Sequence, residues 1–181
     1  MVQHSVQQLL AGYGSASALS RPLSEGLQAV VTSAAEILDV SSVGVLLLDE
    51  HEHLRAVAAS GSAAVALESV QQEIGIGPGV DTVTMSITVT VDDLSTVPKY
   101  TELADRVVSK GACAIVSAPV WVNGSVAGNL NAILGEAHHW SSAEVDAVET
   151  YAGLIAALLQ LNASTVRDSV WSSDDDWDVE R

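Results

Sequence analysis

The chain has 181 residues, 23 acidic against 7 basic, and a formal net charge of −16, and this length fits one domain with short flanking segments. The scattered basic residues form no stripe that could bind nucleic acid or an anionic membrane surface, and the longest apolar runs are far shorter than the ~20 residues of a membrane-spanning helix. Because no secretory signal is recognised and the one cysteine permits no internal disulfide, we expect a cytoplasmic protein.

The first half of the chain begins with helical patterns and continues with strands. Residues 1–20 combine a short helical pattern with a Gly/Ser-rich linker. Pro22 then lies in the first turn of an amphipathic helix predicted over 22–39, in which apolar residues recur every three to four positions. Two strands are predicted next, over 43–48 and 54–60, joined by a polar turn.

The middle of the chain predicts alternating short elements. A second helix is expected over 63–73 and ends at a glycine-rich turn. The segment 87–91 alternates Ile or Val with Thr, which is the period of a half-buried strand. A short helix is expected over 99–109. The connecting segments 75–85 and 92–105 are expected to be mobile loops.

The strongest local pattern is the dipeptide Asn123-Gly124 between two apolar segments, 112–122 and 125–134. This dipeptide tolerates the positive φ angles of a tight turn, so it predicts a β-hairpin. The complete order of elements predicts an α+β fold, with a central antiparallel sheet of five or six strands and helices grouped by face.

The last helix, predicted over 142–161, begins at a capping box in which Glu144 can reach back to the backbone N–H of Ser141. Its two adjacent apolar stripes are wider than one sheet contact requires, which indicates a second packing partner. Beyond it, residues 164–181 are acidic and poor in aliphatic side chains, so we expect a disordered tail. The chain thus divides into an N-terminal helix and linker (1–20), one domain (21–163) and the tail.

Five segments, in this order along the chain, carry a family resemblance. They are LDVSSVGVLLLDEHEHLRAVAASG (38–61), EIGIGPGVDT (73–82), VTVDDL (89–94), KGACAIVSAPVWVNGSVAGNLNAIL (110–134) and WSSAEVDAVETYAGLIAALL (140–159). Together they resemble a GAF domain, and they look most like the GAF domains of actinobacterial regulators that precede an ANTAR output domain. The resemblance implies terminal helices on one face of the sheet and loops or short helices over the other.

The sequence departs from these relatives at two places. The relatives usually have GEGPC in the glycine-rich turn, whereas Gly75-Ile76-Gly77-Pro78-Gly79 lacks both the acid and the thiol. The acidic residues of 168–180 have the wrong sign for an RNA-binding ANTAR domain, so we expect no such output domain.

Cys113 is the one thiol, and a reactive cysteine needs a low pKa beside a cation or a resolving partner. It lies in a predicted apolar strand, so a buried and inert cysteine is favoured. By resemblance, the methionine sulfoxide reductases of the GAF fold use several cysteines, and bilin-binding members attach their chromophore through a cysteine on another segment. A chain without Phe also lacks the Asn-Lys…Phe…Asp-Glu signature of the GAF domains that bind cyclic nucleotides.

The histidine pairs His51/His53 and His138/His139 could be metal ligands, but each pair lies in a predicted loop without a third or fourth ligand. Solvated loops are therefore favoured. The adjacent aspartates at 92–93 are interpreted as the end of a strand rather than as an acid/base pair. We expect no catalytic residues, no cofactor and no metal.

The last predicted strand has two amide side chains on the face opposite an apolar one. They could hydrogen-bond a small ligand under the predicted loops, or they could satisfy backbone groups of those loops. By resemblance, the ligand lies on the loop-covered face, although strand parity alone leaves the choice of face open. The candidate pocket residues are Asn129, Asn131, Ile133, Ser117, Ile115, Cys113 and Tyr100.

Two functions remain open. The first is a non-catalytic sensory or regulatory module that binds a small molecule and signals through a homodimer. By resemblance, its terminal helices would form the dimer interface, with Ile155, Leu158 and Leu159 as candidates. The second is a degenerate GAF domain that acts as a dimerisation or protein-interaction scaffold. In that case Trp171 and Trp177 of the acidic tail would dock a basic partner, although a disordered solubilising end is the favoured interpretation of such a tail.

Overall fold

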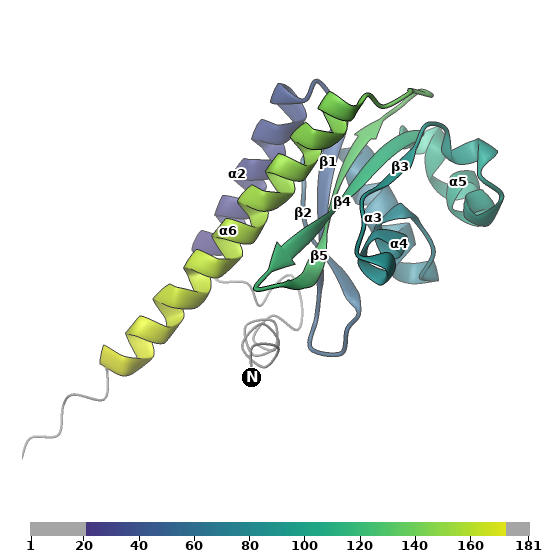
Figure 1. The fold of residues 1–181 in the computed structure, drawn as a ribbon. Coiled ribbons are helices and arrows are strands. Elements are labelled where there is room, and N and C mark those ends of the chain that lie inside the picture. Colours follow the sequence, from purple (N-terminus) through teal and green to yellow (C-terminus); the bar gives the residue numbers. More distant parts are fainter. Residues whose placement is uncertain (1–20, 173–181) are drawn as a thin grey trace, which may run out of the picture.

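The computed structural model describes residues 21–172, and the side chains of residues 21–164. Its centre is a five-stranded antiparallel sheet with the strand order β2-β1-β5-β4-β3 (Figure 1). The strands are β1 (Ser42–Leu48), β2 (Leu54–Ala59), β3 (Val89–Val91), β4 (Ala114–Val122) and β5 (Ser125–Leu134). The helices are α2 (Arg21–Ile37), α3 (Ser62–Ile74), α4 (Pro78–Met85), α5 (Thr101–Val107) and α6 (Ser142–Ser172), with the 3-10 turns η2 (Leu94–Thr96), η3 (Pro98–Tyr100) and η4 (Val108–Lys110).

Helices cover both faces of the sheet. α2 and α6 lie side by side on one face, and α3, α4 and α5 lie on the other (Figure 1). Because successive side chains of a strand point to opposite faces, Val116 and Leu130 pack beneath α2 and α6, whereas Ile115 and Ile133 pack with α3 and α5. The α+β fold with terminal helices on one face is confirmed. In the described part of the chain, no helix is both long and apolar enough to span a bilayer.

The two strongest local patterns of the sequence are confirmed. Asn123 and Gly124 have φ angles of 51° and 79° and join β4 to β5, as a tight hairpin turn requires. At the start of α6, the backbone N–H of Ser141 donates to Glu144 Oε2 at 2.7 Å, and the backbone N–H of Glu144 donates to Ser141 Oγ at 3.3 Å. The capping box therefore fixes where α6 begins.

The prediction of a loop over 75–85 is wrong, because α4 occupies residues 78–85. Pro78 lies in the first turn of this helix, where its missing N–H needs no intrahelical partner. The helix ends at Ser86, which has a left-handed φ of 58°. This reversal leaves only Val89–Val91 of the strand predicted over 87–91.

The helix α6 is longer than the sequence predicts, since it continues to Ser172 and includes the first part of the predicted tail. Elongating a helix that is already anchored adds one hydrogen bond for each residue fixed, so the loss of apolar residues after 163 does not end it. Residues 1–20 and 173–181, including Trp177, lie outside the described residues. The second packing partner of α6 is α2, because a Cβ at Gly26 would lie 3.6 Å from Leu158 Cδ1.

Candidate functional site

A cluster of polar side chains is buried between the sheet and the helices α3 and α4. Each of its members is at most 1% exposed. They are Glu68 and Gln71 of α3, Thr82 of α4, Ser117 of β4, and Asn129 and Asn131 of β5. We refer to these six residues as the buried polar cluster. It lies on the sheet face covered by α3, α4 and α5, which corresponds to the face on which the family resemblance places a ligand.

The cluster begins with the carboxylate of Glu68, which receives two side-chain hydrogen bonds. Asn131 Nδ2 donates to Glu68 Oε1 at 2.8 Å, and Gln71 Nε2 donates to Glu68 Oε2 at 3.2 Å. The same Gln71 amide accepts the backbone N–H of Gly79 at its Oε1, 2.8 Å away. This N–H belongs to the first turn of α4, which has no intrahelical acceptor for it. Gln71 thus joins the start of α4 to Glu68.

The second part of the cluster links β4, β5 and α4. Asn129 Nδ2 donates to Ser117 Oγ at 3.1 Å, and Thr82 Oγ1 donates to the backbone carbonyl of Ser117 at 3.1 Å. The antiparallel register brings these residues together, since Ser117 of β4 is paired with Asn131 of β5. The strand alternation predicted from the sequence therefore places three candidate residues in one cluster.

A glycine in β1 makes room for the carboxylate. Gly44 is paired with Asn131 in the sheet, and a Cβ at Gly44 would lie 2.3 Å from Glu68 Oε1. A contact this short is not possible between nonbonded atoms, so any larger residue at position 44 would displace Glu68. The glycine in the run VGVLLL is thus a requirement of the cluster.

Burial raises the pKa of the Glu68 carboxyl to about 7, although the hydrogen bonds from Asn131 and Gln71 oppose this effect. Both partners are neutral amides, so no cation compensates the charge of the carboxylate. At neutral pH the group is therefore divided between its protonated and ionised forms. A buried carboxyl with a perturbed pKa is typical of functional sites.

Two acceptors of the cluster are unsatisfied. Asn129 Oδ1 and Asn131 Oδ1 are buried and have no hydrogen-bond partner. A buried polar atom without a partner costs about 1–3 kcal/mol of stability. The cluster therefore retains unused acceptor capacity at these two oxygens.

A cavity of about 450 Å³ opens beside the cluster, between the β1–β2 hairpin and the helices α3 and α4. Its lining includes Leu48, Leu54 and Arg55 from the hairpin and Val80 and Thr84 from α4. Gln71 belongs both to the cavity wall and to the buried polar cluster. This side chain is thus the boundary between the open cavity and the carboxylate of Glu68.

The other candidate pocket residues lie outside the cluster. Ile115, Ile133 and Tyr100 are buried in the apolar core beneath α3 and α5. The hydroxyl of Tyr100 donates to Asp81 of α4, and burial together with this contact raises its pKa to about 12.

Cys113 precedes β4, and its Sγ donates to Asp93 Oδ1 at 3.6 Å. Burial and the nearby Asp93 carboxylate raise the pKa of the thiol. A thiolate is therefore disfavoured at this position.

Glu68, Gln71 and Thr82 belong to the site but are absent from the sequence-based candidates. The buried face of α3 follows the spacing 64, 67, 68, 71, which is the i, i+3, i+4, i+7 pattern of a core-facing stripe. Two positions of this apolar pattern hold Glu68 and Gln71. Polar residues at core-facing helix positions were the signal that could have identified them.

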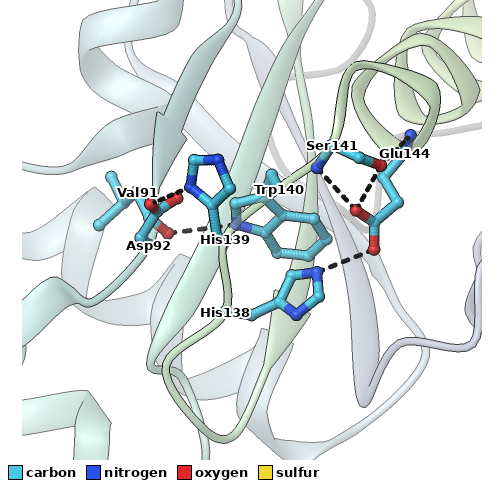
Figure 2. A network of polar contacts seen from close by, with 7 residues as sticks. All are labelled: Val91, Asp92, His138, His139, Trp140, Ser141 and Glu144. Atoms are coloured by element: carbon cyan, nitrogen blue, oxygen red, sulfur yellow. Dashed lines mark hydrogen bonds and ion pairs between the residues drawn. The ribbon is translucent and has the colours of Figure 1, made fainter.

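The histidines of the loop before α6 are paired with carboxylates (Figure 2). His138 Nε2 lies 2.8 Å from Glu144 Oε1, and His139 Nδ1 lies 2.7 Å from Asp92 Oδ2. The Asp92 carboxylate raises the pKa of His139. Between them, the indole Nε1 of Trp140 donates to a backbone carbonyl of β3 at 3.2 Å. These contacts connect the end of β3 to the first turn of α6.

The candidate dimer residues face the interior of the chain. Ile155 and Leu159 are buried beneath α6 against the sheet, and Leu158 is half-buried against α2. α2 and the sheet cover these side chains within the chain, and a dimer interface that includes them stays a prediction. The apolar side chains that α6 exposes include Leu154, which is 48% exposed.

Comparison with known proteins adds to this geometry. The family model of the GAF domain matches residues 22–159. No curated protein sequence matches the chain significantly. Among solved structures, the GAF domain of a phosphoenolpyruvate-protein phosphotransferase from Coxiella burnetii is similar, with a TM-score of 0.62, 18% identity, and coverage of 91% of this chain and 96% of that one.

Two further structures show the same fold. The GAF domain of Thermosynechococcus elongatus PixJ, in its blue-light absorbing form, has a TM-score of 0.62 and 14% identity, covering 84% of this chain and 92% of that one. A type II free methionine-R-sulfoxide reductase from Thermoplasma acidophilum has a TM-score of 0.58 and 22% identity, covering 77% of this chain and 96% of that one. At these identities the likeness describes the fold, which serves sensory proteins and also an enzyme.

Proposed function

This chain belongs to the GAF family, and from that premise we propose that it is a non-catalytic sensory module that binds a small molecule at the buried polar cluster and signals through a homodimer. We also retain, as proposals, a cytoplasmic location and a relation to actinobacterial GAF-ANTAR regulators. GAF domains form part of regulatory and sensory proteins, which agrees with this role.

One observation carries the proposal. The cluster contains two buried amide oxygens without partners, Asn129 Oδ1 and Asn131 Oδ1, and it adjoins a cavity of about 450 Å³ through Gln71. Cavities of this size hold small molecules, and a few convergent polar groups orient them. A ligand that reaches the cluster would supply the missing hydrogen bonds.

The polar chemistry of the described residues supports a non-catalytic role. The thiol of Cys113 has a raised pKa, which is the opposite of what a nucleophilic cysteine requires. Each histidine of the described part lies against a carboxylate rather than a hydroxyl or thiol. Such histidines have no nucleophile to activate.

A path for the signal runs from the sheet face that α3, α4 and α5 cover to the start of α6 on the opposite face. Asp92 follows β3, and its backbone carbonyl accepts the N–H of His138 at 2.9 Å. The adjacent Trp140 is buried and packs beneath α6 (Figure 2). A ligand that moves α4 or β3 would therefore shift the position where α6 begins.

Native mass spectrometry of the purified full-length protein tests this proposal. We expect a dimer mass that carries a stoichiometric small adduct, together with ligand-dependent hydrogen exchange over residues 142–161. A monomer at micromolar concentration would refute signalling through a dimer. The sensory role would be refuted by a dimer that carries no adduct and whose hydrogen exchange over residues 142–161 is not altered by any small molecule.

A second function, a degenerate GAF scaffold, is favoured by the tight packing of the cluster. A Cβ at Gly79 would lie 2.7 Å from Asn129 Nδ2, and a Cβ at Gly77 would lie 2.2 Å from Gln71 Oε1. The space directly above the amides is thus filled by α4. A clean dimer that binds a protein partner only when residues 164–181 are present would support the scaffold and its docking tail.

A further inference from the structure

We propose that the buried polar cluster recognises a nitrogen cation, such as an amidinium, guanidinium or ammonium group, rather than a carboxylate or a phosphate. This inference rests on the proposed function, because it assigns the chemical class of the ligand that the module senses. It follows from the acceptors, the charges and the access route of the cluster.

The cluster atoms without any hydrogen-bond partner are two acceptors, Asn129 Oδ1 and Asn131 Oδ1. The Nδ2 group of each amide donates one of its two N–H groups, to Ser117 and to Glu68 respectively. A carboxylate oxygen accepts more than one hydrogen bond, so Glu68 can accept another. A group rich in N–H donors satisfies these oxygens, whereas an anion would meet oxygen atoms.

The charges around the site also disfavour an anion. The cavity lining contains one arginine, Arg55, and its Nε already donates to Asp49 Oδ2 at 2.8 Å. The nearby Lys99 is likewise paired, with Asp81 of α4. Glu68 itself has no cationic partner, so a bound cation would compensate a buried charge that the protein leaves uncompensated.

The access route passes through Gln71. Gln71 is the cluster residue that also lines the cavity, although it is fully buried, and its Nε2 lies 3.2 Å from Glu68 Oε2. Rotation of Gln71 would expose the carboxylate and would also release the backbone N–H of Gly79. Cation binding is thereby coupled to the start of α4.

Several titratable groups surround this route. Glu52, His53 and Arg55 line the cavity from the β1–β2 hairpin, while Glu68 faces it from behind Gln71. Protonation of Glu68 would remove the charge that a cation binds. The dependence on pH therefore assigns the site only in combination with a variant of Glu68.

Three probes that share one aromatic ring separate the head groups. Benzamidine carries an amidinium, benzamide a neutral amide and benzoate a carboxylate. Titration calorimetry on the full-length protein at pH 8 is expected to show that benzamidine binds at least tenfold more tightly than benzoate. Equal or tighter binding of benzoate would overturn the inference and leave the sensory proposal in place. No binding of any probe would also overturn it. The sensory proposal would fall only if the native mass spectrum also showed no adduct and no small molecule altered the hydrogen exchange of residues 142–161.

The variant Glu68→Gln removes the charge but keeps the shape of the side chain. We expect it to weaken benzamidine binding at least tenfold and to leave benzamide binding unchanged. The control Glu73→Gln makes the same change on an exposed position of α3 and is expected to bind benzamidine like the wild type. Equal weakening in both variants would reveal a general charge effect and would overturn the assignment to Glu68.

The dependence on pH provides an independent readout. With a pKa of about 7, Glu68 is about 10% ionised at pH 6 and about 90% ionised at pH 8, so benzamidine affinity is expected to rise about tenfold over this range. The rise should disappear in Glu68→Gln. A rise that persists unchanged in this variant would contradict the proposed site.

Discussion

Replacing Glu68 by Gln is expected to stabilise the protein at alkaline pH and to leave its stability at acidic pH nearly unchanged. Burial raises the pKa of Glu68 from its ordinary value of 4.5 to about 7. Between these values the unfolded chain releases the proton while the folded protein retains it. The free energy of unfolding of the wild type therefore falls as the pH rises from 4.5 to 7, and this loss ends once both states are ionised.

The size of the effect follows from the two pKa values. A difference of one pKa unit corresponds to about 1.4 kcal/mol, so the change from 4.5 to about 7 corresponds to a loss of about 3 kcal/mol at pH 8. A glutamine has no charge to desolvate and loses none of this stability. Asn131 can rotate its amide so that Oδ1, which has no partner in the wild type, accepts from the new Gln side chain.

Urea denaturation of both proteins at pH 5 and pH 8 measures this difference. The other titrating groups, including His139 with its raised pKa, are present in both proteins and cancel in the comparison. The free energy of unfolding of Glu68→Gln should exceed that of the wild type by about 2.5 kcal/mol more at pH 8 than at pH 5, because part of the loss has already occurred at pH 5. A difference that is the same at both pH values would show that Glu68 does not titrate as a buried group, and the reasoning would fail.

Three further predictions concern other parts of the structure. Gly44→Ala should lower the free energy of unfolding, measured by urea denaturation, by about 1–3 kcal/mol, because its Cβ would overlap the Glu68 carboxylate. This loss should be smaller when Glu68 is also replaced by Ala. An equal loss with and without Glu68 would exclude the overlap as the cause. Trp140→Phe should keep most of the packing but lose the hydrogen bond to β3, which costs about 1 kcal/mol and should speed hydrogen exchange at the start of α6; unchanged exchange would show that the bond does not couple β3 to α6. Cys113, with its raised pKa, should react with a thiol reagent at pH 8 far more slowly in the folded protein than in urea, and equal rates would contradict its burial.

The sequence predicts best those elements whose signal is local. The dipeptide Asn123-Gly124 determines a turn by its own backbone preferences, and the capping box of Ser141 and Glu144 satisfies its own helix start. Neither depends on distant residues, so both could be derived without the fold. Strand alternation likewise predicted that Asn129 and Asn131 share a face, because the period of a strand is fixed by covalent geometry.

The elements that sequence reasoning missed depend on tertiary contacts. The helix α4 follows a glycine-rich segment, and its first turn is stabilised by the side chain of Gln71 from α3. No local pattern contains that contact. In the same way, the wide apolar surface of α6 predicted a second packing partner without identifying it, and α2 of the same chain covers Leu158. An apolar stripe indicates that something is buried against it but does not identify the covering element.

The same limit explains why Glu68 escaped prediction, and it also indicates why the residue matters. The apolar residues of α3 recur at helical spacing, and one carboxylate among these core-facing positions does not change the pattern that predicts the helix. In the folded protein it combines with Gly44, which provides the space, and with Asn131, which provides one hydrogen bond while keeping one oxygen unsatisfied. Buried acceptors without partners and a buried carboxyl without a cationic partner are unfavourable for stability. Recognition of a donor-rich ligand is the role that we propose for this arrangement.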